Sequence, residues 1–192
     1  KTEQTEKERQ KERRSEEQLG IVVGVNGSSN KMEQLVLKLS QSNLYYFCDW
    51  PNKSVPQIAA GVYVIYDRRG EFLYAGMAGA GLSKDKVKQL KEIKGRKSGL
   101  FDRLGSHASG YRSGDRFNIY VCDLFVLKSL TSSQINDISN KRISLDAINK
   151  EYIRSNLSYR YLVVESGVVR GLERYIQEFG INGETPSINP LV

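Results

Sequence analysis

Residues 61–78 read GVYVIYDRRGEFLYAGMA, and this stretch decides the fold. Its first half is rich in the β-branched and aromatic side chains that strands favour, and residues 71–78 resume an apolar run. The polar, glycine-ended segment at residues 68–70 predicts a tight turn between the two halves. We therefore expect a β-hairpin. Because side chains alternate along a strand, Tyr63 and Tyr74 share one face if the two registers match.

The next informative segment is SGLFDRLGSHASG, residues 98–110, which predicts a helix with Ser98 as its N-cap. Arg103 and His107 are four residues apart, so they lie one turn apart on a single face of this helix. The two groups repel when both are charged, but the pair makes sense if both contact an anion. His107 is the only histidine in the chain, which excludes a metal site built on two histidines.

Taken together, these residues resemble the GIY-YIG nuclease family, and the resemblance covers residues 61–192. The matching elements, in the family order, are GVY at 61–63, YAG at 74–76, Arg103-x-x-x-His107, Glu173 on a later helix, and a closing Pro186-Ser187-Ile188-Asn189. The family's isoleucines are replaced by Val62 and Ala75, and many members carry tyrosine where His107 stands. The histidine form is similar to the restriction endonucleases of the family, whereas the excision-repair branch typically has the tyrosine.

This resemblance implies a Mg²⁺-dependent phosphodiester hydrolase. Glu173 would hold Mg²⁺, a hard cation that prefers oxygen ligands and keeps several waters, and Mn²⁺ is expected to be able to replace it. Arg103 would clamp the scissile phosphate, for which a planar, permanently charged guanidinium is well suited. A single carboxylate fits a site with one metal ion better than a site with two.

The general base is open at this point between two residues. Tyr63 would orient or deprotonate the attacking water, although a free tyrosine has a pKa of ~10 and needs positive charge nearby. His107 is the alternative, because its ordinary pKa of about 6.5 suits neutral pH. Tyr74 is expected to hydrogen-bond the phosphate or the water, and Asn189 to fix the Glu173 side of the site.

Positive charge is concentrated around the predicted Arg-His helix. The chain has a formal net charge of +7, and residues 84–118 hold ten lysines and arginines against four acidic residues. Such a basic stretch beside a candidate site is the electrostatic footprint of a phosphate-backbone contact. Besides Arg103, the expected DNA-binding residues are Lys84, Lys86, Lys88, Lys91, Lys94, Arg96, Lys97, Arg112 and Arg116.

Three regions make up the chain: a charged arm at 1–18, an extension at 19–60, and a core at 61–192 with an insertion at 128–155. The arm contains no large apolar residue. Other expected elements are a strand at 19–25, a helix at 30–41 capped by Ser28 or Ser29, a strand at 116–127, helix over 131–155, a strand at 159–166 and a helix at 168–179. Cys48 and Cys122 fit no zinc-ligand spacing and are expected to be two buried free thiols.

The sequence thus predicts an α+β fold, with a GIY-YIG-like core whose small mixed or antiparallel sheet is flanked by helices. No apolar run has the length of a membrane span, so no membrane partner and a cytoplasmic location are expected. The favoured function is a type II restriction enzyme that cuts double-stranded DNA as a homodimer or higher homo-oligomer. A mobile-element, repair or toxin nuclease with the same core is the nearest alternative, and an inactive DNA-binding module is the alternative from another class. The extension and the insertion are where base recognition is expected.

Overall fold

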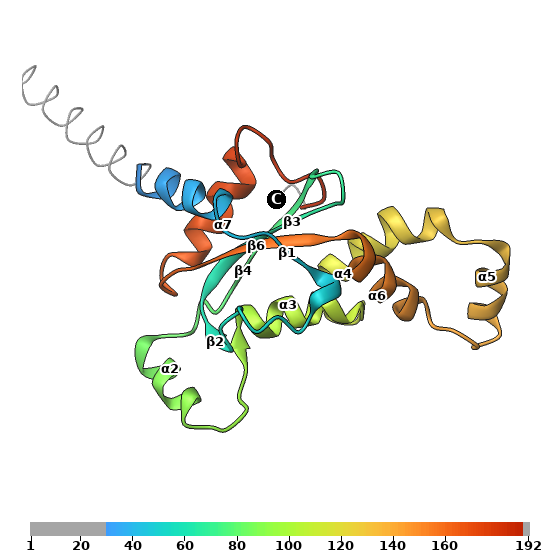
Figure 1. Cartoon of the computed structure of the whole chain (residues 1–192), viewed down its shortest axis with the longest axis horizontal. Coiled ribbons are helices and arrows are strands. Elements are labelled where there is room, and N and C mark those ends of the chain that lie inside the picture. The colour runs from blue at the N-terminus through green and yellow to red at the C-terminus, as the bar shows by residue number, and fades with distance from the viewer. Residues whose placement is uncertain (1–29, 190–192) are drawn as a thin grey trace, which may run out of the picture.

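A four-stranded antiparallel sheet with the strand order β1-β6-β3-β4 stands at the centre of the computed structural model, which describes residues 30–189. Its strands are β1 (Tyr45–Tyr46), β3 (Gly61–Tyr66), β4 (Phe72–Ala78) and β6 (Ser158–Val163). Figure 1 shows α7 (Val169–Phe179) and the helix at residues 30–40 on one side of the sheet, with α3 (Leu100–Ser109) and α6 (Leu145–Asn156) on the other. The predicted α+β class is confirmed.

Alternation along β3 divides the interior into two cores. Val62 and Val64 are fully buried against the side that carries α7 and the helix at residues 30–40. Tyr63 and Ile65 point to the opposite side, where they pack with residues of α3 and α6. Because both faces of this strand are covered, a shift of one residue in its register would exchange the two cores.

The predicted hairpin of β3 and β4 is confirmed. The Asp67 carboxylate accepts the backbone N–H groups of Arg69 and Glu71 at 2.8 Å each, which closes the turn. Tyr63 pairs with Gly76, and Ile65 pairs with Tyr74. Residues 63, 65, 74 and 76 therefore share one face, and the two tyrosines lie on it as expected.

A segment rich in basic residues follows the hairpin. Ser83 caps α2 (Lys84–Lys91) by accepting the backbone N–H of Lys86. A short parallel pair of β2 (Ile58–Ala59) and β5 (Ser98–Gly99) then leads into α3. The expected cap at Ser98 is wrong, because this residue lies in β5 and Gly99 occupies the cap position with a φ of 74°. A positive φ favours glycine, which has no Cβ to clash.

The expected strand at residues 116–127 is also wrong, because this segment is helical. It forms α4 (Arg116–Val121), a π-helical turn η2 (Cys122–Val126) and a 3₁₀ turn η3 (Leu127–Ser129). Asp115 caps α4 by accepting the backbone N–H groups of Phe117 and Asn118. Phe117, Val121 and Val126 are fully buried at spacings of four and five residues, which fit an α-helix followed by a π-helical turn. In a short apolar run this spacing is hard to distinguish from the alternation of a strand.

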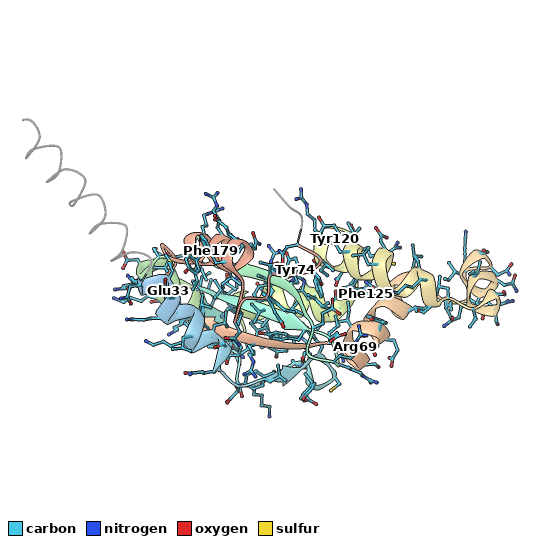
Figure 2. The ribbon with its side chains drawn as sticks, turned by 90° about the horizontal axis from the view of Figure 1, so that it is seen from above. Glu33, Arg69, Tyr74, Tyr120, Phe125 and Phe179 are labelled. Carbon is cyan, nitrogen blue, oxygen red and sulfur yellow. The ribbon has the colours of Figure 1, made fainter. Side chains whose placement is uncertain are left out.

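The insertion is helical, as expected, and forms an arm of two helices. It contains α5 (Ser132–Ser139) and α6, with a break at residues 140–144 that includes Lys141 at a φ of 57°. Ser144 caps α6 by accepting the backbone N–H of Ala147. No residue of α5 is buried, and Figures 1 and 2 both show the α5 end of the arm projecting away from the sheet.

After α6 the chain enters β6 and then α7, which confirms the strand and the helix expected there. An irregular segment then follows the outer edge of β4. Ser187 and Ile188 donate their backbone N–H groups to the carbonyl oxygens of Phe72 and Leu73 at 3.0 and 2.9 Å. This contact covers an edge strand whose backbone groups would otherwise be unpaired.

Several remaining expectations concern single residues or termini. Cys122 is buried as expected, but Cys48 is exposed on the 3₁₀ turn η1 (Phe47–Asp49), so that half of the prediction is wrong. The helix at residues 30–40 agrees with the expected one, while the arm at 1–18, the strand at 19–25 and the caps at Ser28 or Ser29 lie outside the described residues. None of the helices in the described part of the chain is long and apolar enough to cross a membrane.

Candidate active site

Five of the six predicted catalytic residues line one pocket. They are Tyr63 from β3, Tyr74 from β4, Arg103 and His107 from α3, and Glu173 from α7. The pocket has a volume of about 300 Å³, and its other lining residues are Met77, Gly114, Asp115, Arg116 and Phe117. A strand pair and three helices that are far apart in the sequence thus converge on one small polar space.

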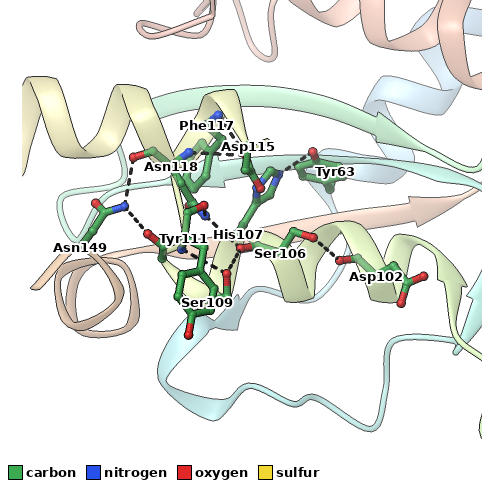
Figure 3. A network of polar contacts seen from close by, with 11 residues as sticks. Tyr63, Asp102, Ser106, His107, Ser109, Tyr111, Asp115, Phe117, Asn118 and Asn149 are labelled. Carbon is green, nitrogen blue, oxygen red and sulfur yellow. Dashed lines mark hydrogen bonds and ion pairs between the residues drawn. The ribbon is translucent and has the colours of Figure 1, made fainter. Parts of the chain in front are cut away.

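A chain of two hydrogen bonds runs through the pocket wall (Figure 3). The Tyr63 hydroxyl lies 2.7 Å from Nε2 of His107, and Nδ1 of His107 lies 2.8 Å from Oδ2 of Asp115. All three side chains are buried, with exposed fractions of 1% for Tyr63 and His107 and 5% for Asp115. His107 is therefore held at both ring nitrogens and does not lie in solvent at the end of its helix.

Burial determines the ionisation of this group. It raises the pKa of Tyr63 well above its ordinary value. It also lowers the pKa of His107, and the hydrogen bond to Asp115 offsets this effect only in part. Burial alone would raise the pKa of the Asp115 carboxyl, but its hydrogen bond with His107 and the backbone N–H of Asn118 bring that pKa below its ordinary value. At neutral pH the group therefore contains a neutral phenol, a neutral imidazole and a carboxylate.

The other side of the pocket carries a cation and a second carboxylate. Burial raises the pKa of Glu173, and the Met77 backbone amide, Arg170 and Arg103 counteract this only in part. Burial and the nearby Glu173 carboxylate raise the pKa of Tyr74 to about 12. Arg103 is exposed and acts against burial on both Glu173 and Tyr74. The pocket therefore combines a guanidinium that solvent can reach with a carboxyl group whose pKa stays raised, because the nearby positive charge does not fully offset its burial.

Gly76 makes room for Tyr63. A Cβ atom added at Gly76 would collide with the hydroxyl oxygen and the Cζ atom of Tyr63. The space beside this glycine is thus occupied by the phenol ring of the paired strand.

Asn189 does not line the pocket. Its side chain accepts the backbone N–H of Ala75 at 2.6 Å and donates to the carbonyl of the same residue at 2.8 Å. Gln177 of α7 also donates to this carbonyl, at 3.2 Å. Asn189 therefore fixes β4 between Tyr74 and Gly76, at a carbonyl that it shares with Gln177 of α7, the helix that carries Glu173.

The predicted DNA-binding residues fall into two groups. The seven basic residues from Lys84 to Lys97 are exposed and lie on α2 or on the segment that follows it. Arg116 lines the pocket, whereas Arg112 is paired with Asp146 of α6 at 2.6 Å. Within the first group, Lys84 is paired with Glu165 and Lys97 lies over the ring of Phe101. The remaining lysines of the run are therefore the better candidates for phosphate contacts.

Asp115 is the residue of the site that the sequence reasoning missed. A signal was present, because Ser-Gly-Asp at residues 113–115 precedes residues that can form a helix, and aspartate is a preferred N-cap. The strand expected at residues 116–127 concealed this signal. If residues 116–127 formed a strand, Asp115 would not cap a helix, and its carboxylate would not be held in place by that cap.

The pocket offers one uncommitted carboxylate to a Mg²⁺ ion. Of the two carboxylates in the lining, Asp115 has both oxygens in use, one for His107 and the other for the cap of α4. Glu173 would thus supply the carboxylate oxygen, with the other positions left to water and substrate phosphate, as is usual for Mg²⁺. A half-buried carboxyl with a raised pKa is also a group whose charged form a cation would stabilise.

Comparison with models of known protein families, with curated proteins and with solved structures found no match for the chain. Function has to be inferred from the arrangement of the residues in the pocket and from the basic surface beside it.

Acidification is expected to destabilise the folded chain through His107. Its pKa is lowered on folding, so between about pH 6.5 and the folded value the unfolded state binds more protons and the free energy of unfolding decreases as the pH falls. Asp115, whose pKa is also lowered, adds to this loss below about pH 4. Melting temperatures at pH 7.5 and 5.5 would measure the effect. The His107→Gln variant serves as the control and should lose less stability between the two values; equal losses would contradict the assignment.

Proposed function

We propose that the chain is a Mg²⁺-dependent endonuclease that hydrolyses phosphodiester bonds in double-stranded DNA. The observation that carries the proposal is the convergence of Tyr63, Arg103, His107 and Glu173 on one pocket of about 300 Å³. These are the residue types that the reaction needs: a group to activate water, a cation for the phosphate, and a carboxylate for a metal ion. The resemblance to GIY-YIG nucleases, noted from the sequence, assigns the same roles to these positions.

Activation of water would begin at Tyr63. The phenol is neutral, and its oxygen lies 2.7 Å from Nε2 of His107, to which it would donate a hydrogen bond. When a water molecule transfers a proton to the phenol oxygen, the phenol proton moves to Nε2, and no separate phenolate has to form. The resulting hydroxide attacks phosphorus, the bond from phosphorus to the leaving sugar oxygen breaks, and that oxygen takes a proton from solvent. This arrangement favours Tyr63 as the group in contact with water and His107 as the final proton acceptor.

The charges on the opposite side would bind the scissile phosphate. Arg103 is exposed at the pocket and can form two parallel hydrogen bonds to phosphate oxygens. Glu173 would hold Mg²⁺, which when bound neutralises charge on the phosphate and stabilises the departing alkoxide. Tyr74 remains neutral at ordinary pH, so its hydroxyl can donate to a phosphate oxygen or to the attacking water.

Type II restriction is the biological role that we propose for this activity. Such an enzyme must read bases as well as phosphates. The described part of the extension at 19–60 and the insertion at 128–155 contribute no residue to the pocket and are the regions that we propose for base recognition. One metal site cuts one strand at a time, so cutting both strands of a duplex favours a homodimer.

The direct test is cleavage of a long duplex DNA of complex sequence with Mg²⁺, with Mn²⁺ and with EDTA. We expect discrete fragments that require the metal ion, since a type II enzyme cuts at fixed sites. A smear of fragments would indicate a nuclease without sequence specificity. Binding of DNA without any cleavage would indicate an inactive DNA-binding module instead.

Reversing charge on α2 is expected to weaken DNA binding and to reduce its dependence on salt. The variant Lys86→Glu, Lys88→Glu, Lys91→Glu removes three exposed lysines for which the structure gives no ion pair. Each lost phosphate contact should reduce the slope of log affinity against log salt by about 1. Arg68→Glu, Arg69→Glu, Arg174→Glu is a control with the same change of charge, at exposed sites outside the pocket and outside the elements proposed for base recognition. Equal slopes in the two triple variants would mean that α2 makes no phosphate contact.

A further inference from the structure

We propose that Asp115 is a positioning residue that fixes His107 in the tautomer able to accept the proton of Tyr63. The consequence for catalysis rests on the proposed nuclease function, whereas the effect on the tautomer does not. The inference starts from the two oxygens of one carboxylate. Oδ1 accepts the backbone N–H groups of Phe117 and Asn118 at 3.0 and 3.4 Å, and Oδ2 lies 2.8 Å from Nδ1 of His107.

The position of the hydrogen on His107 follows from these contacts. An ionised carboxylate only accepts hydrogen bonds, so Nδ1 of His107 must be the donor to Asp115. In a neutral imidazole the other nitrogen then carries no hydrogen, and Nε2 is free to accept from the Tyr63 hydroxyl at 2.7 Å. The opposite tautomer would place a hydrogen on Nε2, facing the phenol, and the transfer from Tyr63 could not occur.

Among the charged groups around the His107 ring, Asp115 is the carboxylate that contacts a ring nitrogen. The rings of Tyr63, Tyr74 and Phe117 pack around His107 with centroid separations of 5.4, 6.0 and 4.5 Å. The other charged groups in the lining of this pocket are Arg103 from the same helix, Arg116 from α4 and Glu173 from α7. Direct contact with a ring nitrogen is given for Asp115 and, on the other side, for the Tyr63 hydroxyl.

Two buried asparagines hold the segment that carries Asp115 (Figure 3). Asn118 donates to the backbone carbonyls of Ser106 and Tyr111, each at 2.9 Å. Asn149 of α6 donates to the carbonyls of Gly110 and Asn118, each at 3.0 Å. Both side chains are fully buried. These bonds connect α3, the loop after it, α4 and α6, so the direction of Asp115 is fixed from several elements.

The Asp115→Asn variant separates positioning from capping. Asparagine is as good an N-cap as aspartate, so the start of α4 should remain intact. If the amide oxygen keeps the two cap bonds, the amide nitrogen faces His107 and presents a donor where the carboxylate presented an acceptor. His107 would then shift toward the tautomer with hydrogen on Nε2. Asp102→Asn is the matched control, because it removes the same charge from an exposed site on α3.

The experiment reads the ring directly, because His107 is the only histidine in the chain. In the full chain labelled with ¹⁵N-histidine, the imidazole nitrogen shifts should show hydrogen on Nδ1 in the wild type and in Asp102→Asn, and a shift toward Nε2 in Asp115→Asn. Cleavage by Asp115→Asn should fall about 10²-fold or more, the range for a lost proton acceptor, with the melting temperature and DNA affinity close to those of Asp102→Asn.

Three outcomes overturn the inference: hydrogen on Nε2 in the wild type, hydrogen that stays on Nδ1 in Asp115→Asn, or an unchanged cleavage rate in Asp115→Asn. The wild-type spectrum needs no variant, so failure of Asp115→Asn to fold leaves the proposal open to refutation. If the wild-type chain cuts no DNA at all, the proposed function fails, and the comparison of the two spectra still decides whether Asp115 sets the tautomer.

Discussion

Glu173→Gln is expected to abolish DNA cleavage while leaving duplex binding almost unchanged. The substitution keeps the size of the side chain but removes the only carboxylate of the pocket lining that is not already committed to His107 and the cap of α4. If Glu173 holds Mg²⁺ as proposed, loss of the ion would remove several kcal/mol of transition-state stabilisation, and each 1.36 kcal/mol is a factor of ten. We therefore expect the rate to fall by about 10³-fold or more. The basic surface of α2 lies outside the pocket and should still bind DNA.

The matched control is Glu178→Gln, which makes the same change at an exposed residue of the same helix. Single-turnover cleavage and a gel-shift assay on the same duplex would separate chemistry from binding. Full activity of Glu173→Gln at ordinary Mg²⁺ concentrations would refute the assignment of Glu173 as the metal ligand. A loss of binding equal to the loss of cleavage would show that Glu173 supports the DNA-binding surface instead.

Tyr63→Phe is the second large effect that we expect, and it tests the mechanism most directly. It deletes one hydroxyl and keeps the ring that fills the space over Gly76, so the hairpin should fold as before. If this hydroxyl passes the proton of water to His107, the turnover rate should fall by about 10² or more. Tyr66→Phe is the control, because Tyr66 lies in the same strand but does not line the pocket. Turnover, DNA affinity and melting temperature should all be measured.

His107→Ala belongs in the same series, since it should lose activity whichever residue is the base. The two variants together identify the base. Near-normal cleavage by Tyr63→Phe beside an inactive His107→Ala would transfer the role to His107 and would overturn the mechanism proposed above. Inactivity of both is the result that the 2.7 Å contact between the two side chains leads us to expect.

The hairpin could be predicted from the sequence because its information is local. Period-two alternation and a turn with Asp67 at its start fix both the strands and the shared face of Tyr63 and Tyr74. The spacing of four residues between Arg103 and His107 is local information too, so their shared helix face could also be predicted. That Glu173, from a helix some seventy residues further along the chain, reaches the same pocket could not be read from any local pattern; only the order of the motifs suggested it.

Three features of the structure have tertiary causes that no local pattern indicates. Residues 116–127 alternate well enough for a strand, but the Asp115 cap and burial at helical spacing impose a helix. The arm breaks into two helices at a turn whose positive φ at Lys141 no simple propensity indicates. Asn189 contacts Ala75, a residue more than a hundred positions earlier, so its partner depended on the sheet edge that the final segment follows. Each of these requires knowledge of which elements lie side by side.

The projecting arm divides the site residues into two unequal sets. Tyr63, Tyr74, Arg103, His107 and Asp115 precede the exposed turn at residues 140–144, and Glu173 follows it. A backbone cut in this turn would break no contact of the pocket, yet each fragment would lack part of the site. If the chain is the nuclease proposed above, this turn is a natural position at which to split it, and DNA cleavage would then report that two separately made pieces had come together.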